Sequence, residues 1–178
     1  MKRLIALLLS AFGLPAAAAP DVGDPAPDFT ARASLAGREF TYSLAAALKQ
    51  GPVVLYFYPA AFTKGCTIEA REFAQAMPKF QELGASVIGV SNDDIGTLNR
   101  FSASECQGKF PVASDADQRI MKAYDAVLLW KTGYASRTSF VITPGGRVAY
   151  RFSDLRPEPH VANTLAAVRE WAAARDKR

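Results

Sequence analysis

The stretch VVLYFYPAAFTKGC, residues 53–66, decides the fold. Its first part, VVLYFY, is an unbroken run of β-branched and aromatic residues that ends at Pro59, which is typical of a strand buried on both faces. From Cys66 onward the apolar residues recur at helical spacing, as Phe73, Met77 and Phe80. A strand, a loop and a helix in this order predict an α/β fold. They place the loop at the carboxyl edge of the sheet, where α/β proteins bind ligands.

Further elements alternate on either side of this stretch. Before it, we expect REFTYS (38–43) to pair as an edge hairpin and SLAAALKQ (43–50) to form a short helix. After it, we expect a strand in 85–91, and then a helix capped by 92–94 that runs toward Cys106 and Gly108. We expect a further helical patch over 117–124 and a hairpin of 138–143 and 147–153. The final helix should present four apolar residues on one face: Val161, Leu165, Val168 and Ala172. Pro78 suggests a kink or a restart in the helix that Gly84 ends. The pattern predicts one domain over 20–178, with a central mixed β-sheet flanked by helices.

The N-terminal segment, residues 1–19, differs from the rest of the chain. Lys2 and Arg3 precede an apolar run over 4–14, and Pro15 and four alanines follow. This is the three-part layout of a secretory signal peptide, with cleavage expected near 17–19. The apolar run is too short to cross a bilayer as a helix, which needs about 20 residues. We therefore expect a periplasmic protein without stable membrane association, and a retained anchor is the less favoured alternative.

The charge balance bears on one class of partner, nucleic acids. Lys2 and Arg3 belong to the expected signal peptide, which leaves 19 basic residues against 17 acids. The basic residues are dispersed, so nothing in the sequence predicts nucleic-acid binding. A hydrophobic content of 49% is enough for a well-packed single core.

Only two cysteines, Cys66 and Cys106, occur in the chain. An oxidising compartment would permit a disulfide between them. Their wide separation is neither that of a CxxC redox pair nor that of a zinc site, and His160 is the only histidine. We therefore expect no structural zinc site. Cys66 opens a helix, where unpaired N–H groups and the helix dipole favour a thiolate.

The residues PAAFTKGC resemble the peroxiredoxin motif Pro-x-x-x-Thr-x-x-Cys, matched by Pro59, Thr63 and Cys66. With GCTIEA, VIGVS, FPVASD and RTSFVITPGGRV, most of residues 21–173 is similar to the bacterioferritin-comigratory, or Q-type, branch of that family. The resemblance implies a thioredoxin-like fold. It also implies the reduction of hydrogen peroxide and organic hydroperoxides by a cysteine thiolate, without a metal or an organic cofactor.

The resemblance also implies roles for individual residues. Cys66 would be the peroxidatic cysteine, Pro59 would shield the pocket, and Arg137, just before the strand TSFVIT, would hold the thiolate and the peroxide oxygen. Glu69 matches the acid of the family's Cys-Thr-x-Glu run. It could orient an arginine or, in the first helical turn, serve the helix dipole.

Ionisation alone does not make a useful peroxidase. Conversion of a thiol to mostly thiolate raises its reactive fraction about thirtyfold. The accompanying fall in nucleophilicity is roughly thirteenfold. Fixed donors must therefore stabilise the charge that moves onto the departing oxygen, and the candidates are the Thr63 hydroxyl, the Cys66 N–H and the Arg137 guanidinium.

One position departs from many Q-type sequences, which have a second cysteine five residues after the first. Here that position is Arg71. Other members carry the second cysteine on a later helix, and we expect Cys106 in such a helix, so the resemblance implies that Cys106 resolves the sulfenic acid as a disulfide. A thioredoxin-like protein would then reduce the disulfide, and the chain would be a monomer or a weak homodimer. The alternatives for Cys106 are a structural disulfide, a buried free thiol, or no part in a one-cysteine mechanism.

Three rival functions stay open on the sequence alone. An exported binding or scaffold module would use a structural Cys66–Cys106 disulfide, and a thiol-disulfide reductase without peroxidase activity is disfavoured by the missing CxxC. A cysteine hydrolase would need His160 as its base, and we expect His160 at the surface near a helix start. Phe62, Trp130 and Tyr134 could line a substrate mouth but are expected mainly in the core, and Lys64 either raises the local potential or is simply solvated.

Overall fold

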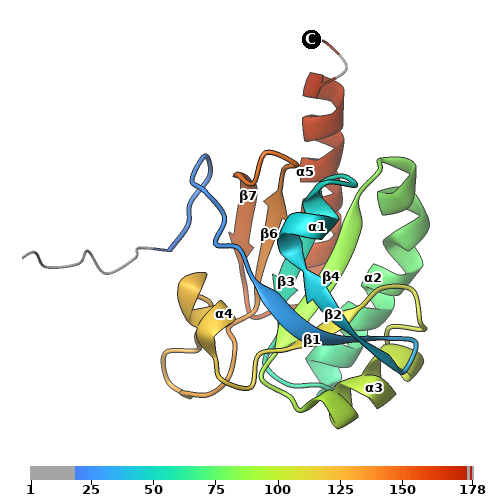
Figure 1. Cartoon of the computed structure of the whole chain (residues 1–178), viewed down its shortest axis with the longest axis vertical. Coiled ribbons are helices and arrows are strands. Elements are labelled where there is room, and N and C mark those ends of the chain that lie inside the picture. Colours follow the sequence, from blue (N-terminus) through green and yellow to red (C-terminus); the bar gives the residue numbers. More distant parts are fainter. Residues whose placement is uncertain (1–18, 176, 178) are drawn as a thin grey trace, which may run out of the picture.

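The computed structural model describes residues 19–175 and 177, in which a mixed sheet is flanked by helices (Figure 1). The strands are β1 (Thr30–Leu35), β2 (Arg38–Ser43), β3 (Val53–Phe57), β4 (Ser86–Ser91), β5 (Val112–Ser114), β6 (Thr138–Ile142) and β7 (Val148–Ser153). The helices are α1 (Leu44–Leu48), α2 (Lys64–Glu82), α3 (Ile95–Ser104), α4 (Arg119–Ala123) and α5 (Glu158–Arg175). The seven strands have the order β2-β1-β5-β4-β3-β6-β7.

Strand β3 lies inside the sheet and supplies residues to both of its faces. It pairs in parallel with β4 and antiparallel with β6. Its successive side chains point to opposite faces, so Val54 and Tyr56 join one apolar core whereas Val53 and Leu55 join the other. All four are at most 1% exposed, which explains why this strand reads as a continuous apolar run.

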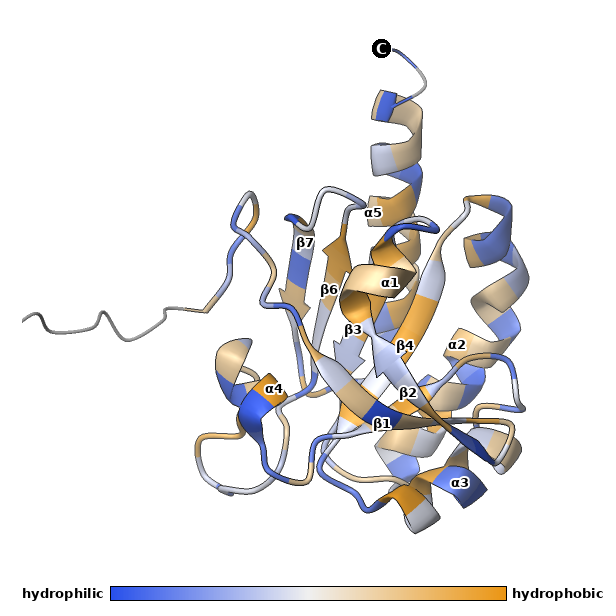
Figure 2. Cartoon of the chain, in the orientation of Figure 1, coloured by the Kyte–Doolittle hydropathy of each residue, from blue (hydrophilic) through white to orange (hydrophobic). Residues whose placement is uncertain are grey.

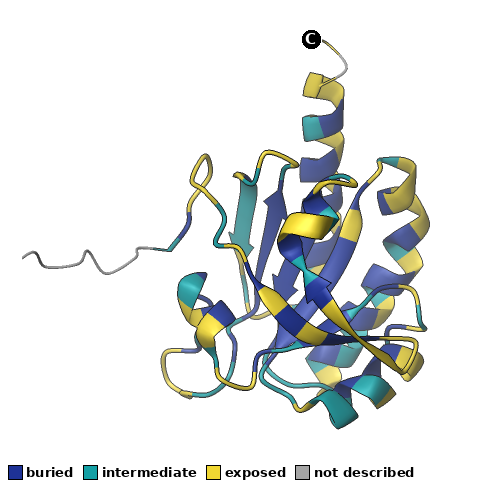
Figure 3. Ribbon diagram, viewed as in Figure 1, coloured by how far each residue is buried: buried dark blue, intermediate teal, exposed yellow. Residues whose placement is uncertain are grey.

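The helices divide between the two faces of the sheet. Helices α2, α3 and α5 pack on the core that contains Val54, and α1 and α4 pack on the core that contains Val53. Hydrophobic residues concentrate in the central strands and on the helix faces turned toward them (Figure 2). The same regions are buried, while the outer helix faces and the turns are exposed (Figure 3). This arrangement confirms the predicted thioredoxin-like architecture.

Most predicted elements are present. The edge hairpin is β1 with β2, the hairpin around 144–146 is β6 with β7, and the buried face of α5 includes Val161, Leu165, Val168 and Ala172. The short strand β5 was not predicted, because three residues carry too little periodicity to be recognised.

Two predictions about helices need correction. Helix α2 does not restart at Pro78 but is continuous through it, since the burial of residues on both sides, including Met77 and Phe80, holds the turn that lacks one hydrogen bond. Helix α3 ends at Ser104, so Cys106 lies beyond the helix rather than in it. The chain turns there, with Gln107 and the following Gly108 in the left-handed region, which a continuing helix does not allow.

The expected signal peptide lies outside the described residues, apart from Ala19. Within the described part of the chain, no helix combines the length and the apolar character that crossing a membrane requires.

Candidate active site

Strand register brings the two principal candidate residues together. Cys66 follows the loop at the carboxyl end of β3, and Arg137 directly precedes β6. Because β6 runs antiparallel to β3 and pairs Thr138 with Phe57, the start of β6 lies beside the end of β3. Residues 71 positions apart in the sequence therefore meet at one edge of the sheet.

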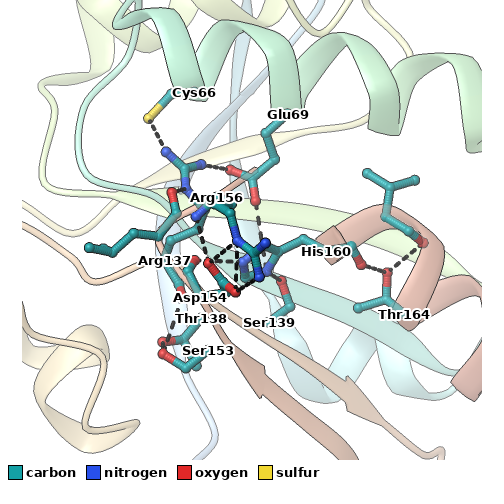
Figure 4. A network of polar contacts seen from close by, with 12 residues as sticks. Cys66, Glu69, Arg137, Thr138, Ser139, Ser153, Asp154, Arg156, His160 and Thr164 are labelled. Atoms are coloured by element: carbon teal, nitrogen blue, oxygen red, sulfur yellow. Dashed lines mark hydrogen bonds and ion pairs between the residues drawn. The ribbon is translucent and has the colours of Figure 1, made fainter. Parts of the chain in front are cut away.

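Cys66 is the third residue of α2, which begins after Thr63 at the N-cap position. In this first turn the backbone N–H groups have no partner within the helix, and the positive end of the dipole favours an anion. The Cys66 side chain is 1% exposed, and Arg137 Nη2 donates to its Sγ at 3.4 Å (Figure 4). Two sources of positive potential thus converge on one sulfur, which is a setting that stabilises a thiolate.

Arg137 is fixed by three contacts on its guanidinium. Nε donates to the Leu155 carbonyl at 3.0 Å, Nη1 donates to Glu69 Oε2, and Nη2 faces the sulfur. Burial opposes its charge, but the negative charges of Glu69 and Cys66 outweigh that effect and raise the pKa of Arg137 above its ordinary value. The guanidinium is therefore a preorganised cation at the sulfur.

Gly65 provides the space through which Arg137 reaches Cys66. A Cβ atom at this position would lie 3.1 Å from Arg137 Nη2 and 4.0 Å from Pro157 Cγ. The first contact is tighter than ordinary van der Waals packing, so any larger residue here would displace the guanidinium. This explains why glycine precedes the cysteine.

Thr63 and Pro59 both lie in the loop before α2, as predicted. The Thr63 side chain is exposed, and its hydroxyl donates to the Ala60 carbonyl at 2.9 Å. A hydroxyl has one proton to donate and two lone pairs. In this arrangement the Thr63 hydroxyl oxygen can accept a hydrogen bond from a ligand but has no proton left to donate, whereas the sequence suggested a donor. Pro59 is half-buried at the base of the loop.

Asp93 holds this loop against the end of β4. Its Oδ2 accepts hydrogen bonds from the Ala61 N–H and the Ser91 hydroxyl, both at 2.8 Å. The sequence suggested only helix capping for residues 92–94, and Asp94 is the one that caps α3, through the Thr97 N–H. Nothing in the sequence distinguishes a capping aspartate from one that clamps a distant loop.

Glu69 orients Arg137 and does not serve the helix dipole, because no acidic residue lies in the first turn of α2. Its side chain is fully buried, and burial raises the pKa of Glu69 to about 8, against the opposing effect of Arg137. Only Oε2 is engaged, since Oε1 has no hydrogen-bond partner.

His160 was expected at the surface, and this prediction was wrong. It lies near the start of α5, but its side chain is fully buried below Glu69, with Nδ1 at 3.9 Å from Glu69 Oε1. The segment before α5 contacts both groups, because Arg137 Nε donates to the Leu155 carbonyl and Nε2 of His160 lies 2.9 Å from the Asp154 carbonyl (Figure 4). The His160 ring lies 3.9 Å from an acid on the far side of the arginine, so a hydrolase pair of Cys66 and His160 has no support in the structure.

Comparison with known proteins accounts for this arrangement. The AhpC/TSA family model matches residues 22–151. The chain is 34% identical to peroxiredoxin Bcp of Xanthomonas campestris over 127 residues, which are 67% of this chain and 78% of the relative. It is also 34% identical to the chloroplastic peroxiredoxin Q of Oryza sativa over 144 residues, which are 80% of this chain and 64% of that relative.

The chain belongs to the AhpC/TSA family, in its Q-type peroxiredoxin branch. The crystal structure of peroxidoxin BcpB from Mycobacterium tuberculosis superposes with a TM-score of 0.77 at 32% identity, over 85% of this chain and 97% of that one. Peroxiredoxins are thiol-dependent peroxidases, and this assigns the chain to that class of enzyme. Within residues 19–175 and 177, no three or more His, Cys, Asp or Glu side chains are grouped to hold a metal ion.

The second cysteine of this peroxiredoxin lies in the same apolar core as the first. Cys106 is fully buried, both cysteines are free thiols, and burial raises the pKa of the Cys106 thiol well above its ordinary value. The buried hydroxyls of Tyr56 and Tyr58 are close enough to both sulfurs that a charge on either one would raise the tyrosine pKa. The two thiols therefore border a shared region of the core.

Arg71 stands where many Q-type peroxiredoxins have their second cysteine. Its Nε donates to Glu105 Oε2 at 2.8 Å. Glu105 is the C-cap residue of α3 and directly precedes Cys106. The peroxiredoxin thus has a salt bridge between α2 and the segment that carries its second cysteine.

A pocket of about 320 Å³ lies beside Arg137. Its lining includes Leu129, Trp130 and Leu155, which are 89%, 70% and 57% exposed. Phe62 on the active-site loop is 46% exposed and Tyr134 is half-buried, so the expectation that these aromatic residues lie mainly in the core was wrong. Lys64 is also exposed, in agreement with the solvated alternative.

Proposed function

We propose that Cys66 is the peroxidatic cysteine and that it reduces hydrogen peroxide and organic hydroperoxides. The observation that carries this proposal is the contact of Arg137 Nη2 with Cys66 Sγ at the first turn of α2. The thiolate attacks the terminal peroxide oxygen, so an S–O bond forms and the O–O bond breaks. The sulfur is oxidised to a sulfenic acid, and the departing oxygen takes up a proton as water or an alcohol.

The surrounding residues assist in three ways. Arg137 stabilises negative charge that moves from sulfur to the departing oxygen, and the free N–H groups of the helix turn add to this effect. The Thr63 hydroxyl accepts a hydrogen bond from the peroxide O–H, because its own proton is donated to Ala60. Pro59 shields the pocket from water and shapes the loop. We propose no metal and no organic cofactor for this step.

The pocket that shares Arg137 with the site supports an organic hydroperoxide as substrate. Leu129, Trp130 and Leu155 in its lining offer exposed apolar surface to an alkyl group. Burial of apolar surface contributes about 25 cal/mol per Å². The pocket can therefore favour organic hydroperoxides over hydrogen peroxide.

Cys106 would complete the cycle as the resolving cysteine. Its thiol condenses with the Cys66 sulfenic acid, which forms an S–S bond and releases water. Both sulfurs are buried and Cys106 holds its proton tightly, so the first turn of α2 and the segment after α3 must open locally before they react. A dithiol protein of the thioredoxin type then reduces the disulfide.

The place of action follows from residues 1–19. Their layout supports export to the periplasm after cleavage near 17–19. The reductant would then be an exported thioredoxin-like protein. We propose a monomer or a weak homodimer, without nucleic-acid or stable membrane association.

Turnover and free thiols in three proteins test the proposal. Wild type should consume hydroperoxide repeatedly with a dithiol donor, whereas Cys66→Ser should consume none. Cys106→Ser should react once and then stall as a sulfenic acid. Full turnover by Cys106→Ser with the same donor would remove Cys106 from the mechanism, and turnover by Cys66→Ser would reject the proposal altogether.

A further inference from the structure

Phe62 has a backbone conformation that its side chain does not favour. Its φ is +63°, in the left-handed region, where bulky residues are rare and glycine or asparagine is usual. The residue lies in the turn that the Thr63 N–H closes onto the Ala60 carbonyl at 3.5 Å. The loop that leads into the Cys66 helix turn is therefore strained while it is closed, and opening of the loop would relieve the strain.

A ring contact holds this strained loop against the core. The Phe62 ring meets the Phe101 ring edge to face, with centroids 5.2 Å apart and ring planes at 83°. Phe101 belongs to α3, is fully buried and stacks on Tyr58, with centroids 5.6 Å apart. Because Phe62 is 46% exposed and Phe101 is fully buried, the contact fastens the loop to a fixed part of the core.

Phe101 also holds the segment that carries the second cysteine. Its carbonyl accepts the Glu105 N–H at 2.9 Å and the Cys106 N–H at 3.1 Å. These two hydrogen bonds fix the chain where it leaves α3, and the Cys106 segment is released when they break. Phe101 therefore contacts the Cys66 loop through its ring and the Cys106 segment through its carbonyl.

We propose that Phe62 is a positioning residue for the resolution step, because its ring links the opening of the Cys66 loop to the release of the Cys106 segment through Phe101. This inference rests on the proposed role of Cys106 as the resolving cysteine. While the loop is closed, the ring contact helps to keep both thiols buried in one core. When the loop opens, the Phe62 ring leaves Phe101, and the last turn of α3 loses packing. The Cys106 thiol then reaches the Cys66 sulfenic acid, an S–S bond forms and water leaves.

The ring and the backbone of Phe62 have opposite effects on opening. The ring contact stabilises the closed state, and loss of such an aromatic pair changes an equilibrium about fivefold. The positive φ destabilises the closed state, and glycine, which tolerates this φ, would favour closure roughly threefold over alanine. Two substitutions at this one position therefore separate the two effects.

The rate of disulfide formation tests the inference. Rapid quenching and intact-protein mass measurement give this rate at hydrogen peroxide concentrations where it no longer depends on peroxide. Phe62→Ala loses the ring but keeps the strained φ, so it should form the disulfide about fivefold faster than the wild type. Phe62→Gly loses both, so it should be roughly threefold slower than Phe62→Ala. The inference is overturned if Phe62→Ala is no faster than the wild type, or if Phe62→Gly is no slower than Phe62→Ala.

Two controls connect these rates to the contact with Phe101. Gln118, the N-cap residue of α4 on the other face of the sheet, also has a positive φ, of 61°. Gln118→Gly relieves the same kind of strain there and should leave the rate unchanged. In a double-mutant cycle, Phe62→Ala should have no further effect once Phe101 is replaced by Leu. An undiminished effect in that background would show that the Phe62 ring acts elsewhere, and would overturn the inference.

A second measurement does not depend on the reaction or on the folding of Phe101→Leu. In the reduced protein, the amide hydrogens of Glu105 and Cys106 should exchange about fivefold faster in Phe62→Ala than in the wild type. The amides of β3 should not change. Unchanged exchange at Glu105 and Cys106 would overturn the link between the two segments. If exchange is faster but no disulfide forms in any of these proteins, the proposed role of Cys106 fails, and the role of Phe62 in resolution fails with it.

Discussion

The salt bridge between Arg71 and Glu105 should slow disulfide formation. It connects α2 to the residue before Cys106, and both partners must separate when these segments open. Because the Arg71 side chain is 57% exposed, the pair contributes only about 0.5 kcal/mol, as is usual for surface salt bridges. Removal of that energy should raise the population of the open state, and hence the rate of disulfide formation, about twofold.

The assay is rapid quenching followed by intact-protein mass measurement, after a single equivalent of hydrogen peroxide. Loss of water from the sulfenic acid marks disulfide formation. Arg71→Gln should form the disulfide about twofold faster at low salt, and the wild type should approach the variant at high salt, because salt screens exposed charges. Glu105→Gln should behave in the same way.

A matched control removes an exposed pair on the opposite face of the sheet from both cysteines. Arg119 and Asp117 form a 3.3 Å salt bridge at the start of α4, and both side chains are 68% exposed. Arg119→Gln should leave disulfide formation unchanged. If Arg71→Gln is no faster than Arg119→Gln, local opening at the Arg71–Glu105 pair does not limit the reaction, and the predicted role of that pair is refuted.

Three further perturbations have defined outcomes. Gly65→Ala should slow Cys66 oxidation roughly tenfold in stopped-flow assays, because the added Cβ would lie 3.1 Å from Arg137 Nη2. Thermal unfolding of this variant should show no loss of stability, since alanine favours the helix more than glycine does. An unchanged oxidation rate would contradict the close approach of Arg137 to this position. Arg137→Met should slow the same step by about 10²-fold or more, and a smaller effect would contradict its role as a fixed donor. Folded Glu69 holds its proton to a higher pH than the unfolded chain does, so its contribution to stability is complete below about pH 4.5 and is lost as the pH rises through about 8. Denaturant unfolding at about pH 5 and pH 9 should show a smaller decline for Glu69→Gln than for the wild type, and equal declines would contradict the raised pKa.

The parts of the site that follow from the sequence are those set by local pattern. Strand β3, the loop after it and the first turn of α2 are adjacent in the chain, so Pro59, Thr63 and Cys66 could be placed from spacing and propensity. Arg137 could be placed only by resemblance, because its approach to Cys66 depends on the β3–β6 register. Register is a long-range property that the residues around position 137 do not show by themselves.

The parts that the sequence did not reveal depend on tertiary contacts. The sequence suggested that Asp93 caps a helix, yet its carboxylate holds the active-site loop through the Ala61 N–H. The sequence also suggested that His160 lies at the surface near a helix start, yet its side chain is buried beside Glu69. Cys106 was assigned to a helix that ends two residues earlier, because the glycine that marks a helix end in the sequence is Gly108, whereas α3 already ends at Ser104. A weak signal for His160 did exist, since it is the only histidine in the chain.

The central claim is that the Cys66 sulfur, which lies beside Arg137, is the atom that the peroxide oxidises to a sulfenic acid. The direct measurement treats Cys106→Ser with one equivalent of hydrogen peroxide in the presence of a sulfenic-acid trap such as dimedone, and then maps the modified residue by mass spectrometry. Complete, single labelling is expected at Cys66, with much slower labelling when Arg137 is replaced by Met. An unlabelled Cys66 in intact, folded protein would contradict the claim.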